Sequence, residues 1–326
     1  MTNAPADQRV GVQRVGVRRV GVLGVGRMGR PIAERLSAAG FDVTAFDSDP
    51  ARLEGLDAHG IGSAASAARL AESSNLLVTI LPGPPEIADA LGGADALLGR
   101  MHPGACWLDL SSGDPELMAR LAGEAEGRGV LTAEAPMGGG VEAARDGSLT
   151  FYVAGRPRAV DRALPVLHAL GQPSDIHLLG ETPGAGLTAK LLANLLWFGQ
   201  SIAVTEALLL GSRLGVDLPA LRSALASSAG GSAFIDRHLD ALLTGDYLES
   251  FGLDRVVEEL DTMNRLAAGA ATPFELSKLV TSIHHRALDR FGPVAGELLA
   301  ARLLEEQAGT TLAAELADDT RGTDPA

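Results

Sequence analysis

Three glycines at the spacing G-x-G-x-x-G stand between an apolar run and an amphipathic segment near the start of the chain. Val20–Leu23 has the pattern of a strand, Gly24, Gly26 and Gly29 follow it, and Pro31–Ala39 has the pattern of a helix. The first glycine permits the tight turn, the second lets a pyrophosphate approach the backbone, and the third lets helix and strand pack closely. A chain with 40 glycines produces chance matches, so the flanking strand and helix carry the inference. The motif predicts a Rossmann-type dinucleotide-binding unit.

Short apolar runs alternate with amphipathic segments from Val20 to about Leu179, which indicates βαβ units and a mainly parallel sheet. After Gly186 the pattern becomes helical. We therefore expect an α/β fold, a Rossmann-type doubly wound sheet followed by an all-α C-terminal domain. The expected strands are Val20–Leu23, Val43–Phe46, Leu76–Leu81, Cys106–Asp109, Val130–Ala133, Thr150–Ala154 and Ile176–Leu179. The expected helices are Pro31–Ala39, Pro50–Ala58, Ala64–Ala71, Pro115–Arg128, Arg158–Leu170, Leu187–Leu214, Leu218–Ser227, Ala233–Leu243, Leu253–Ala268, Pro273–Phe291 and Val294–Glu306.

These patterns divide the chain into four parts. Residues 1–18 carry two copies of a short Arg-Val-Gly-Val repeat whose third copy, at Arg19, enters the glycine motif. We expect them to form a disordered extension without a function, although the copies could also pair as an edge strand. Residues 19–182 are the predicted nucleotide-binding domain, residues 183–309 the predicted helical domain for substrate binding and oligomerisation, and residues 310–326 a predicted flexible acidic tail.

The charge and the cysteine content of the chain exclude some classes of partner. A formal net charge of −14 argues against nucleic acid and anionic membranes, because little would neutralise their phosphates. The longest apolar segments carry Lys190, Asn194 or Glu206, so we expect no membrane span. The N-terminus lacks the order of residues of a secretory signal. Because Cys106 is the only cysteine, no internal disulfide can form, and we expect a cytoplasmic protein.

An acidic residue follows the second predicted strand, where such folds bind the adenosine ribose. Asp47 lies 18 residues after Gly29, close to the usual spacing. Its carboxylate would repel the extra phosphate of NADP, and Ser48 stands where a phosphate-binding arginine would be expected. We therefore predict NAD as the cofactor, preferred over NADP. Arg52, one helical turn further on, is the residue that could defeat this preference. Alternatively, Asp47 only starts the turn before Pro50.

Other strand ends meet the same edge of the sheet, where doubly wound folds bind their ligands. The residues expected to bind the cofactor are Gly24, Gly26, Arg27, Met28, Gly29, Asp47, Leu81, Pro82 and Ser112. Ser111 is expected to bind the substrate near the nicotinamide. A second interpretation of this segment is helix initiation, with Asp114 as N-cap and Pro115 as the first helical residue. Both interpretations can hold.

A single lysine interrupts the apolar helix predicted after Gly186. Of the 27 basic residues only Lys190 and Lys278 are lysines, which leaves 25 arginines. Arginine does not give up its proton in proteins, whereas a partly desolvated lysine can, and a carbonyl/alcohol couple needs such a proton donor and acceptor. Asn194 lies four residues later on the same helix face. The alternative is a lysine that snorkels to solvent.

Four ordered motifs make the chain resemble the β-hydroxyacid dehydrogenase family, of the 3-hydroxyisobutyrate dehydrogenase type, from about Val20 to Gly309. They are Gly24-Val25-Gly26-Arg27-Met28-Gly29, Asp109-Leu110-Ser111-Ser112 with Pro115, Glu134-Ala135-Pro136-Met137-Gly138-Gly139-Gly140 with Ala143, Gly147 and Leu149, and Gly184-Ala185-Gly186 with Lys190 and Asn194. The resemblance implies that Lys190 is the acid/base and that Asn194 orients it or the substrate. It further implies that Gly139 and Gly140 offer N–H groups to a substrate carboxylate, with Gly138 beside them, and that the helical domain forms homodimers or homotetramers.

Three departures from the family pattern bear on the substrate. The family usually has Ser where this chain has Gly138, which removes a hydroxyl from the expected carboxylate site. It often has Asn at the position of Ala193. Its later Lys-Asp pair, which reaches toward the cofactor, aligns with Glu258-Glu259, so a cation is replaced by an anion. We expect a small β-hydroxy acid or semialdehyde as substrate, altered from 3-hydroxyisobutyrate.

Other functions and sites are weaker hypotheses. An imine reductase-like enzyme shares the architecture but usually lacks the lysine found here as Lys190. A non-catalytic NAD(H)-binding regulator is the alternative from another class. The loss of a cation at Glu258 leaves room for it, whereas the presence of Lys190 and Asn194 argues against it. His284-His285 have no third ligand at metal spacing, so no metal is expected and a surface or interface role is predicted. Cys106 is predicted to be buried filler rather than a nucleophile.

Overall fold

The computed structural model describes residues 19–92, 96–249 and 251–321 and divides the chain into two compact units, Met1–Lys190 and Leu191–Ala326. The sequence predicted this boundary between residues 182 and 183, at the start of the long helix. The division instead falls within that helix, between Lys190 and Leu191. The predicted N-terminal extension, residues 1–18, lies outside the described residues.

The first unit is built on a twisted sheet in the order β3-β2-β1-β4-β5-β6-β8-β7, with β9 paired to β8. Its strands are β1 Arg19–Leu23, β2 Asp42–Phe46, β3 Gly62–Ser63, β4 Leu76–Thr79, β5 Cys106–Asp109, β6 Leu131–Glu134, β7 Met137–Gly138, β8 Thr150–Gly155 and β9 Ile176–Leu178. Pairing is parallel from β3 through to β6, and antiparallel where β8 meets β6 and β7. The order reverses at β1 and β4, so the predicted doubly wound Rossmann sheet is confirmed.

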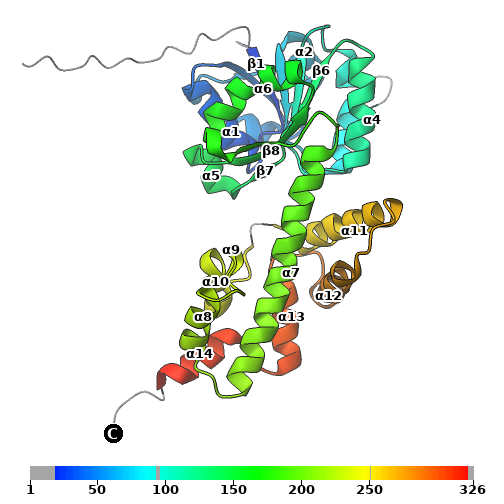
Figure 1. Cartoon of the computed structure of the whole chain (residues 1–326). Coiled ribbons are helices and arrows are strands. Elements are labelled where there is room, and N and C mark those ends of the chain that lie inside the picture. Colours follow the sequence, from blue (N-terminus) through cyan, green and yellow to red (C-terminus); the bar gives the residue numbers. More distant parts are fainter. Residues whose placement is uncertain (1–18, 93–95, 250, 322–326) are drawn as a thin grey trace, which may run out of the picture. The chain divides into compact units, whose positions relative to one another are not determined.

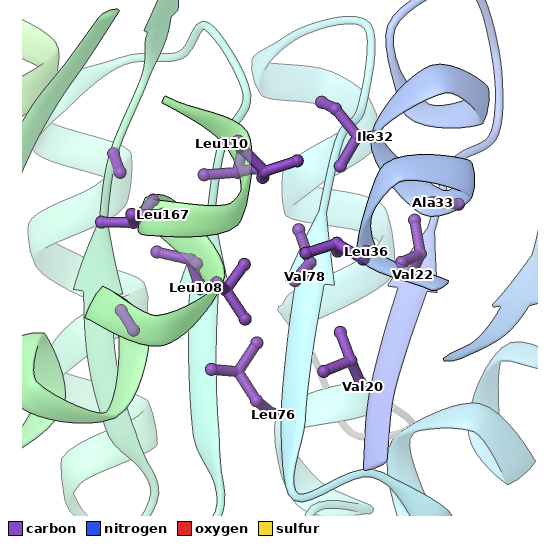
Figure 2. Packing of buried hydrophobic residues seen from close by; sticks show 14 of the residues in the cluster. Val20, Val22, Ile32, Ala33, Leu36, Leu76, Val78, Leu108, Leu110 and Leu167 are labelled. Carbon is purple, nitrogen blue, oxygen red and sulfur yellow. The ribbon is translucent and has the colours of Figure 1, made fainter. Parts of the chain in front are cut away.

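Helices cover both faces of this sheet (Figure 1). They are α1 Gly29–Ala38, α2 Ala67–Ser73, α3 Pro84–Leu91, α4 Pro115–Glu126, α5 Gly140–Asp146 and α6 Pro157–Leu170. Successive strand residues point to opposite faces, so Leu76 and Val78 pack toward α1 and α6 (Figure 2), whereas Leu77 packs toward α2, α3 and α4. The expected helix Pro50–Ala58 is wrong. Its place is taken by two 3₁₀ turns, Pro50–Leu53 and Asp57–His59, because Gly55 between them is left-handed (φ +75°).

The second unit is helical, as predicted. Its elements are α7 Ala185–Arg213, which begins in the first unit, α8 Leu218–Ala226, α9 Ala233–Arg237, α10 Leu239–Thr244, α11 Leu253–Gly269, α12 Glu275–Phe291, α13 Leu299–Ala308 and α14 Leu312–Arg321. The predicted helix Ala233–Leu243 breaks at His238, and the helix predicted from Val294 begins only at Leu299. Gly296 (φ +145°) accounts for the later start, since its backbone is not helical.

The predicted flexible tail from residue 310 is wrong over its first part, because residues 312–321 form α14. Leu312 is fully buried, and its N–H donates to the carboxylate of Glu305 (2.8 Å). Glu315 accepts from the hydroxyls of Ser212 (2.5 Å) and Thr310 (2.7 Å). Glu315 therefore joins this helix to α7, and Glu305 of α13 accepts from the start of the helix.

The long helix α7 passes the length and composition test for a membrane span, although its sequence predicted none. Its most apolar window has a mean hydropathy of 1.3, but 44% of that window is buried within the protein. Burial of Leu195, Phe198 and Ile202 among the other helices of the second unit is typical of a core helix.

Two minor predictions have opposite outcomes. Cys106 is fully buried, and burial raises the pKa of its thiol to about 12, so its role as inert core filler is confirmed. The surface or interface role predicted for the histidine pair is wrong for His284, which is fully buried with its Nδ1 bonded to the carbonyl oxygen of Val280 (2.9 Å). Its neighbour His285 lies half-exposed beside Asp261.

Candidate active site

The three glycines of the turn after β1 meet the requirements that their spacing predicted. Gly24 has a left-handed backbone (φ +91°), and a Cβ there would overlap the carbonyl oxygen of Ile80 at the end of β4. A Cβ on Gly29 would overlap the carbonyl oxygen of Gly24, so this glycine lets α1 start against the strand. A Cβ on Gly26 would meet only the tip of Arg52, at 3.7 Å. The turn is therefore tight at Gly24 and Gly29 and open at Gly26, the arrangement that a pyrophosphate needs.

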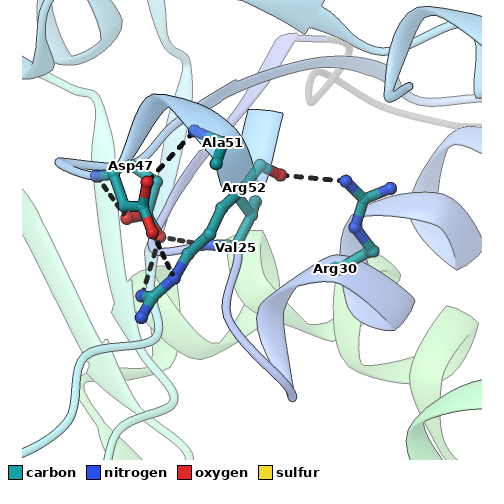
Figure 3. Close-up of polar contacts among 6 residues, drawn as sticks. Val25, Arg30, Asp47, Ala51 and Arg52 are labelled. Carbon is teal, nitrogen blue, oxygen red and sulfur yellow. Dashed lines mark hydrogen bonds and ion pairs between the residues drawn. The ribbon is translucent and has the colours of Figure 1, made fainter. Parts of the chain in front are cut away.

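Asp47 joins the end of β2 to this turn (Figure 3). Its side chain is 5% exposed, with Oδ2 accepting from the N–H of Val25 (2.9 Å) and Oδ1 accepting from the N–H of Asp49 (3.0 Å). The half-exposed guanidinium of Arg52 lies 3.5 Å from the same Oδ2. The carboxylate of Asp47 therefore braces the glycine turn and the residues before Pro50, whereas the side chain of Asp49 caps the 3₁₀ turn that begins at Pro50.

A buried polar network links the ends of β4 and β5. Thr79 donates to Oδ1 of Asp109 (2.7 Å) and accepts from the indole N–H of Trp107 (2.9 Å). The hydroxyl of Ser111 donates to the same Oδ1 (2.7 Å) and accepts from the N–H of Leu81 (3.0 Å). Burial raises the pKa of Asp109 to about 6, against these hydrogen bonds, which lower it. The network holds together the two loops that were expected at the ligand-binding edge of the sheet.

The remaining residues of these two loops differ in exposure. Leu81 and Ser112 are half-buried and Pro82 is exposed, as is Arg27 in the glycine turn, whereas Met28 is half-buried. The helix initiation proposed for the second loop is confirmed, because Asp114 accepts from the N–H of Glu116 (2.8 Å) at the start of α4.

Sequence reasoning missed Glu134, the last residue of β6. It is 1% exposed and stands opposite Asp109 in the parallel register. Its Oε1 accepts from the N–H of Gly186 at the start of α7 (2.7 Å), and its Oε2 is buried without a hydrogen-bond partner in the part of the chain that the structure describes. Burial raises the pKa of this carboxyl to about 7, and the backbone N–H groups of Gly186 and Gly184 lower it. A second carboxylate at a strand end beside Asp109 was the available sequence signal.

The loop expected to hold a substrate carboxylate follows β6. Gly138 ends the two-residue strand β7, and Gly139 (φ +110°) and Gly140 (φ +70°) are exposed at the start of α5. A Cβ on Gly138 would meet Thr150 at an ordinary 3.6 Å. The fold therefore does not demand glycine at residue 138, whereas the left-handed backbones of the next two residues favour it.

Both predicted catalytic residues lie on α7, one turn apart. Lys190, the last residue of the first unit, is half-buried and comes one turn after Gly186. Asn194 belongs to the second unit, where its amide donates to Oε2 of Glu259 (2.6 Å). Glu258 pairs instead with Arg255 (2.8 Å). The two acidic residues that replace the family's Lys-Asp pair thus have different partners.

The residues at this edge of the sheet fit a nicotinamide dinucleotide. The open backbone at Gly26 faces no side chain closer than Arg52, and the helix α1 that follows supplies N–H groups for phosphates. Asp47, directly after β2, is the residue predicted to bind the ribose hydroxyls.

Comparison with known proteins gives matches over both units. A family model described as the NAD binding domain of 6-phosphogluconate dehydrogenase matches residues 19–180. A second, described as the NAD-binding domain of NADP-dependent 3-hydroxyisobutyrate dehydrogenase, matches residues 184–304. The mitochondrial 3-hydroxyisobutyrate dehydrogenase of Mus musculus is 30% identical over 263 residues, which cover 78% of each chain.

Solved structures agree in fold. A crystal structure of 3-hydroxyisobutyrate dehydrogenase from Salmonella typhimurium superposes with a TM-score of 0.75 at 25% identity, covering 87% of this chain and 99% of that one. An imine reductase from Pseudomonas sp. gives 0.56 at 20% identity over 88% and 99% of the two chains, a likeness in fold alone. With two family models in the right order and a relative aligned over most of both lengths, the chain belongs to the β-hydroxyacid dehydrogenase family of NAD(P)-dependent oxidoreductases that act on CH–OH groups.

Proposed function

We propose that the protein transfers a hydride between nicotinamide and a small β-hydroxy acid or its semialdehyde, with Lys190 as general acid/base. The observation that carries this proposal is the first turn of α7, which is fixed to the end of β6 and carries Lys190 one turn later. A lysine so placed, in a chain that otherwise uses arginine, suits a reaction that must move a proton.

In the oxidation direction the neutral amine of Lys190 accepts the hydroxyl proton while the carbinol carbon loses its hydride. The bound nicotinamide supplies the hydride acceptor. In the reverse direction the ammonium of Lys190 donates a proton to the carbonyl oxygen. Asn194 orients Lys190 or the substrate, and its bond to Glu259 restricts its amide to one orientation. General acid–base help of this kind contributes about 10²–10⁴-fold to the rate.

Substrate selection is assigned to the loop after β6 and to Ser111 after β5. The N–H groups of Gly139 and Gly140 would bind the substrate carboxylate, as exposed left-handed glycines can. Gly138 offers no hydroxyl to that carboxylate, so we propose a substrate bulkier beyond the hydroxyl-bearing carbon than 3-hydroxyisobutyrate, or one with a different polar head. Ser111 would act through the loop that it braces, since its hydroxyl already bonds Asp109 and Leu81.

The test is turnover of a panel of short acids, followed through NADH absorbance. The panel contains 3-hydroxyisobutyrate, 3-hydroxypropionate, L-serine and longer 3-hydroxy acids, with the matching semialdehydes in the reverse direction. Lys190→Met should lower kcat at least ~10²-fold, the lower range for a lost general acid, and leave NADH binding within a few-fold. Lys278→Met is the matched control, because it removes the only other lysine, which is exposed on α12, and should keep full activity.

The same panel separates the rival functions. A non-catalytic regulator would bind NADH and turn over none of the acids or semialdehydes, and an imine reductase would consume NADPH or NADH only with cyclic imines. Near-normal kcat in Lys190→Met would remove Lys190 from the mechanism.

The cofactor preference, oligomeric state and location are also part of this proposal. We propose NAD as the preferred cofactor, on the position of Asp47. We propose a homodimer or homotetramer through the helical unit, where large apolar side chains of α7 and α12 are exposed, among them Leu196 (65%), Leu210 (61%) and Leu276 (73%). The proposed location is the cytoplasm, consistent with a single, buried cysteine.

A further inference from the structure

The start of α7 is fixed to the sheet by several contacts within the first unit. Gly184 has a left-handed backbone (φ +90°), and a Cβ there would lie 2.7 Å from the carbonyl oxygen of Pro115. A Cβ on Gly186 would overlap the carbonyl oxygen of Tyr152 in β8. Leu187 is buried among the residues between the sheet and α2, α3 and α4. These close approaches explain the two glycines of the Gly-Ala-Gly motif, and they fix the start of the helix against the sheet.

Glu134 adds a side-chain hydrogen bond to the first turn of this helix. Its Oε1 accepts from the N–H of Gly186, one of the first N–H groups of α7, which has no partner within the helix. The negative carboxylate also faces the positive end of the helix dipole. β6 lies between β5 and β8 in the sheet, so the last residue of this strand ties the start of the helix to a central part of the sheet.

A buried carboxyl group makes this contact at an unfavourable free energy. Glu134 is 1% exposed, its Oε2 has no hydrogen-bond partner among the described residues, and Asp109 stands opposite it. A buried, half-satisfied carboxylate costs stability, and a cap made by a neutral side chain would avoid that cost. Such costs are typical of positions that serve function.

We propose that Glu134 is a positioning residue for the reaction, which holds the first turn of α7 against the end of β6 and thereby aims Lys190. This inference rests on the proposed role of Lys190. Gly186 and Lys190 are four residues apart and share one face of the helix, so a change in the first turn is passed directly to the amine. A displacement of about 1 Å in a reacting group can cost ~10²-fold in rate.

The experiment compares Glu134→Gln and Glu134→Asp with the wild type in the full-length protein. Glu134→Gln keeps the size and one acceptor oxygen but removes the charge, and Glu134→Asp keeps the charge but shortens the reach. The matched control is Asp217→Ala, which removes a carboxylate N-cap from α8 (2.8 Å to the N–H of Ala220) in the second unit. The readouts are kcat for the best-turned-over acid of the panel, the Kd of NADH, and amide hydrogen exchange of residues 184–190.

We expect Glu134→Gln to lower kcat at least ~10-fold with the Kd of NADH within threefold, and to speed exchange in residues 184–190. Glu134→Asp should recover part of both, and Asp217→Ala should change neither. In a Lys190→Met background, Glu134→Gln should cause no further loss of turnover, because it acts through Lys190.

Unchanged kcat together with unchanged exchange in Glu134→Gln overturns the inference, as does a further loss of turnover in the Lys190→Met background. The failure of the proposed function has a different signature. There, Lys190→Met alone keeps near-normal kcat, and faster exchange in Glu134→Gln still supports the anchoring of α7 by Glu134.

Discussion

Two carboxylates end strands of the same sheet, and their surroundings differ. Asp47 follows β2 and is bonded through both oxygens to backbone N–H groups, with Arg52 beside it. Glu134 ends β6 with one oxygen bonded to Gly186 and the other without a partner among the described residues. The hydrogen bonds of Asp47 therefore compensate for the burial of its charge, whereas the charge of Glu134 is buried with one oxygen unpaired among the described residues.

The difference indicates two uses of one edge of the sheet. The β1–β2 side presents backbone to a ligand, so its carboxylate stabilises the turn that the ligand meets. The β5–β6 side holds the helix that carries the proposed acid/base, so its carboxylate, Glu134, bonds the start of that helix rather than a ligand. Substitutions on the first side should change cofactor binding, and substitutions on the second should change catalysis and the pH dependence of stability.

The largest expected effects are on the cofactor turn, and a pair of alanine substitutions separates folding from binding. Gly24→Ala forces an alanine to φ +91° against the carbonyl of Ile80 and should lower the free energy of unfolding by at least ~2 kcal/mol. Its Kd for NADH should rise at least ~100-fold. Gly26→Ala has open space in the free protein and should stay within ~0.5 kcal/mol of wild type in stability, yet bind NADH at least ~10-fold more weakly.

NADH fluorescence titration and denaturant unfolding measure the two quantities. If Gly26→Ala bound NADH as wild type does, the pyrophosphate would not approach the backbone at this glycine. If Gly24→Ala were as stable as wild type, the turn would have an alternative conformation.

The second prediction concerns the pH dependence of stability on the β5–β6 side. The pKa of Glu134 is raised from 4.5 to about 7 in the folded protein. A raised carboxyl pKa stabilises the fold fully below the unfolded value and loses that contribution as pH rises through the folded value. The free energy of unfolding of the wild type should therefore fall by about 3 kcal/mol between pH 4.5 and 7 on account of Glu134.

Glu134→Gln should remove most of this slope, which denaturant unfolding at pH 5, 6, 7 and 8 would show. Asp109, whose pKa is raised to about 6, titrates in both proteins and should leave a smaller slope that ends near pH 6. Asp217→Ala should shift the wild-type curve without changing its slope. Parallel curves for wild type and Glu134→Gln would mean that Glu134 is not the titrating group.

Much of the first unit could be predicted because its signals are local. The glycine spacing, the alternation of strands and helices and Asp47 each follow from a backbone requirement that a short segment carries. The two-residue strands β3 and β7 could not be predicted, since only their partners β2 and β8 define them. The same holds for α14, because its Glu315 bonds Ser212 of α7 and its Leu312 bonds Glu305 of α13, and both partners are distant in sequence or structure from a local helix signal.

The candidate site was predictable only in part, for a related reason. Lys190 stands out in the sequence because it is one of only two lysines in a chain whose other basic residues are arginines. Glu134 does not stand out, because its function depends on Gly186, 52 residues away, and on the missing partner of one oxygen. His284 was wrongly placed at the surface because a polar residue on a helix gives no sign that it faces inward.

The third prediction sharpens the substrate side of the comparison. A Cβ on Gly138 meets only an ordinary contact with Thr150, so Gly138→Ser should fold as wild type does. A hydroxyl that donates to a carboxylate contributes roughly 1.5–3 kcal/mol, so the KM for 3-hydroxyisobutyrate should fall at least ~10-fold. The KM for longer acids should fall by a smaller factor. If the wild type already prefers 3-hydroxyisobutyrate and Gly138→Ser leaves KM unchanged, the backbone N–H groups suffice and the altered-substrate proposal is wrong.

The smallest expected effect tests the Asp47 side, through the choice between NAD and NADP. The buried carboxylate of Asp47 should disfavour a 2′-phosphate by at least ~1.4 kcal/mol, a tenfold preference for NAD in kcat/KM. Arg52 opposes it, because its guanidinium is half-exposed 3.5 Å from Asp47 and could turn to a phosphate. Arg52→Ala should therefore widen the preference by a few-fold through weaker NADP binding, with NAD unchanged. Arg69→Ala, which removes an exposed arginine paired with Glu72 on α2, should leave the ratio as it was. Equal kcat/KM for both cofactors in the wild type, shifted to NAD by Arg52→Ala, would mean that Arg52 outweighs Asp47 at the adenosine end.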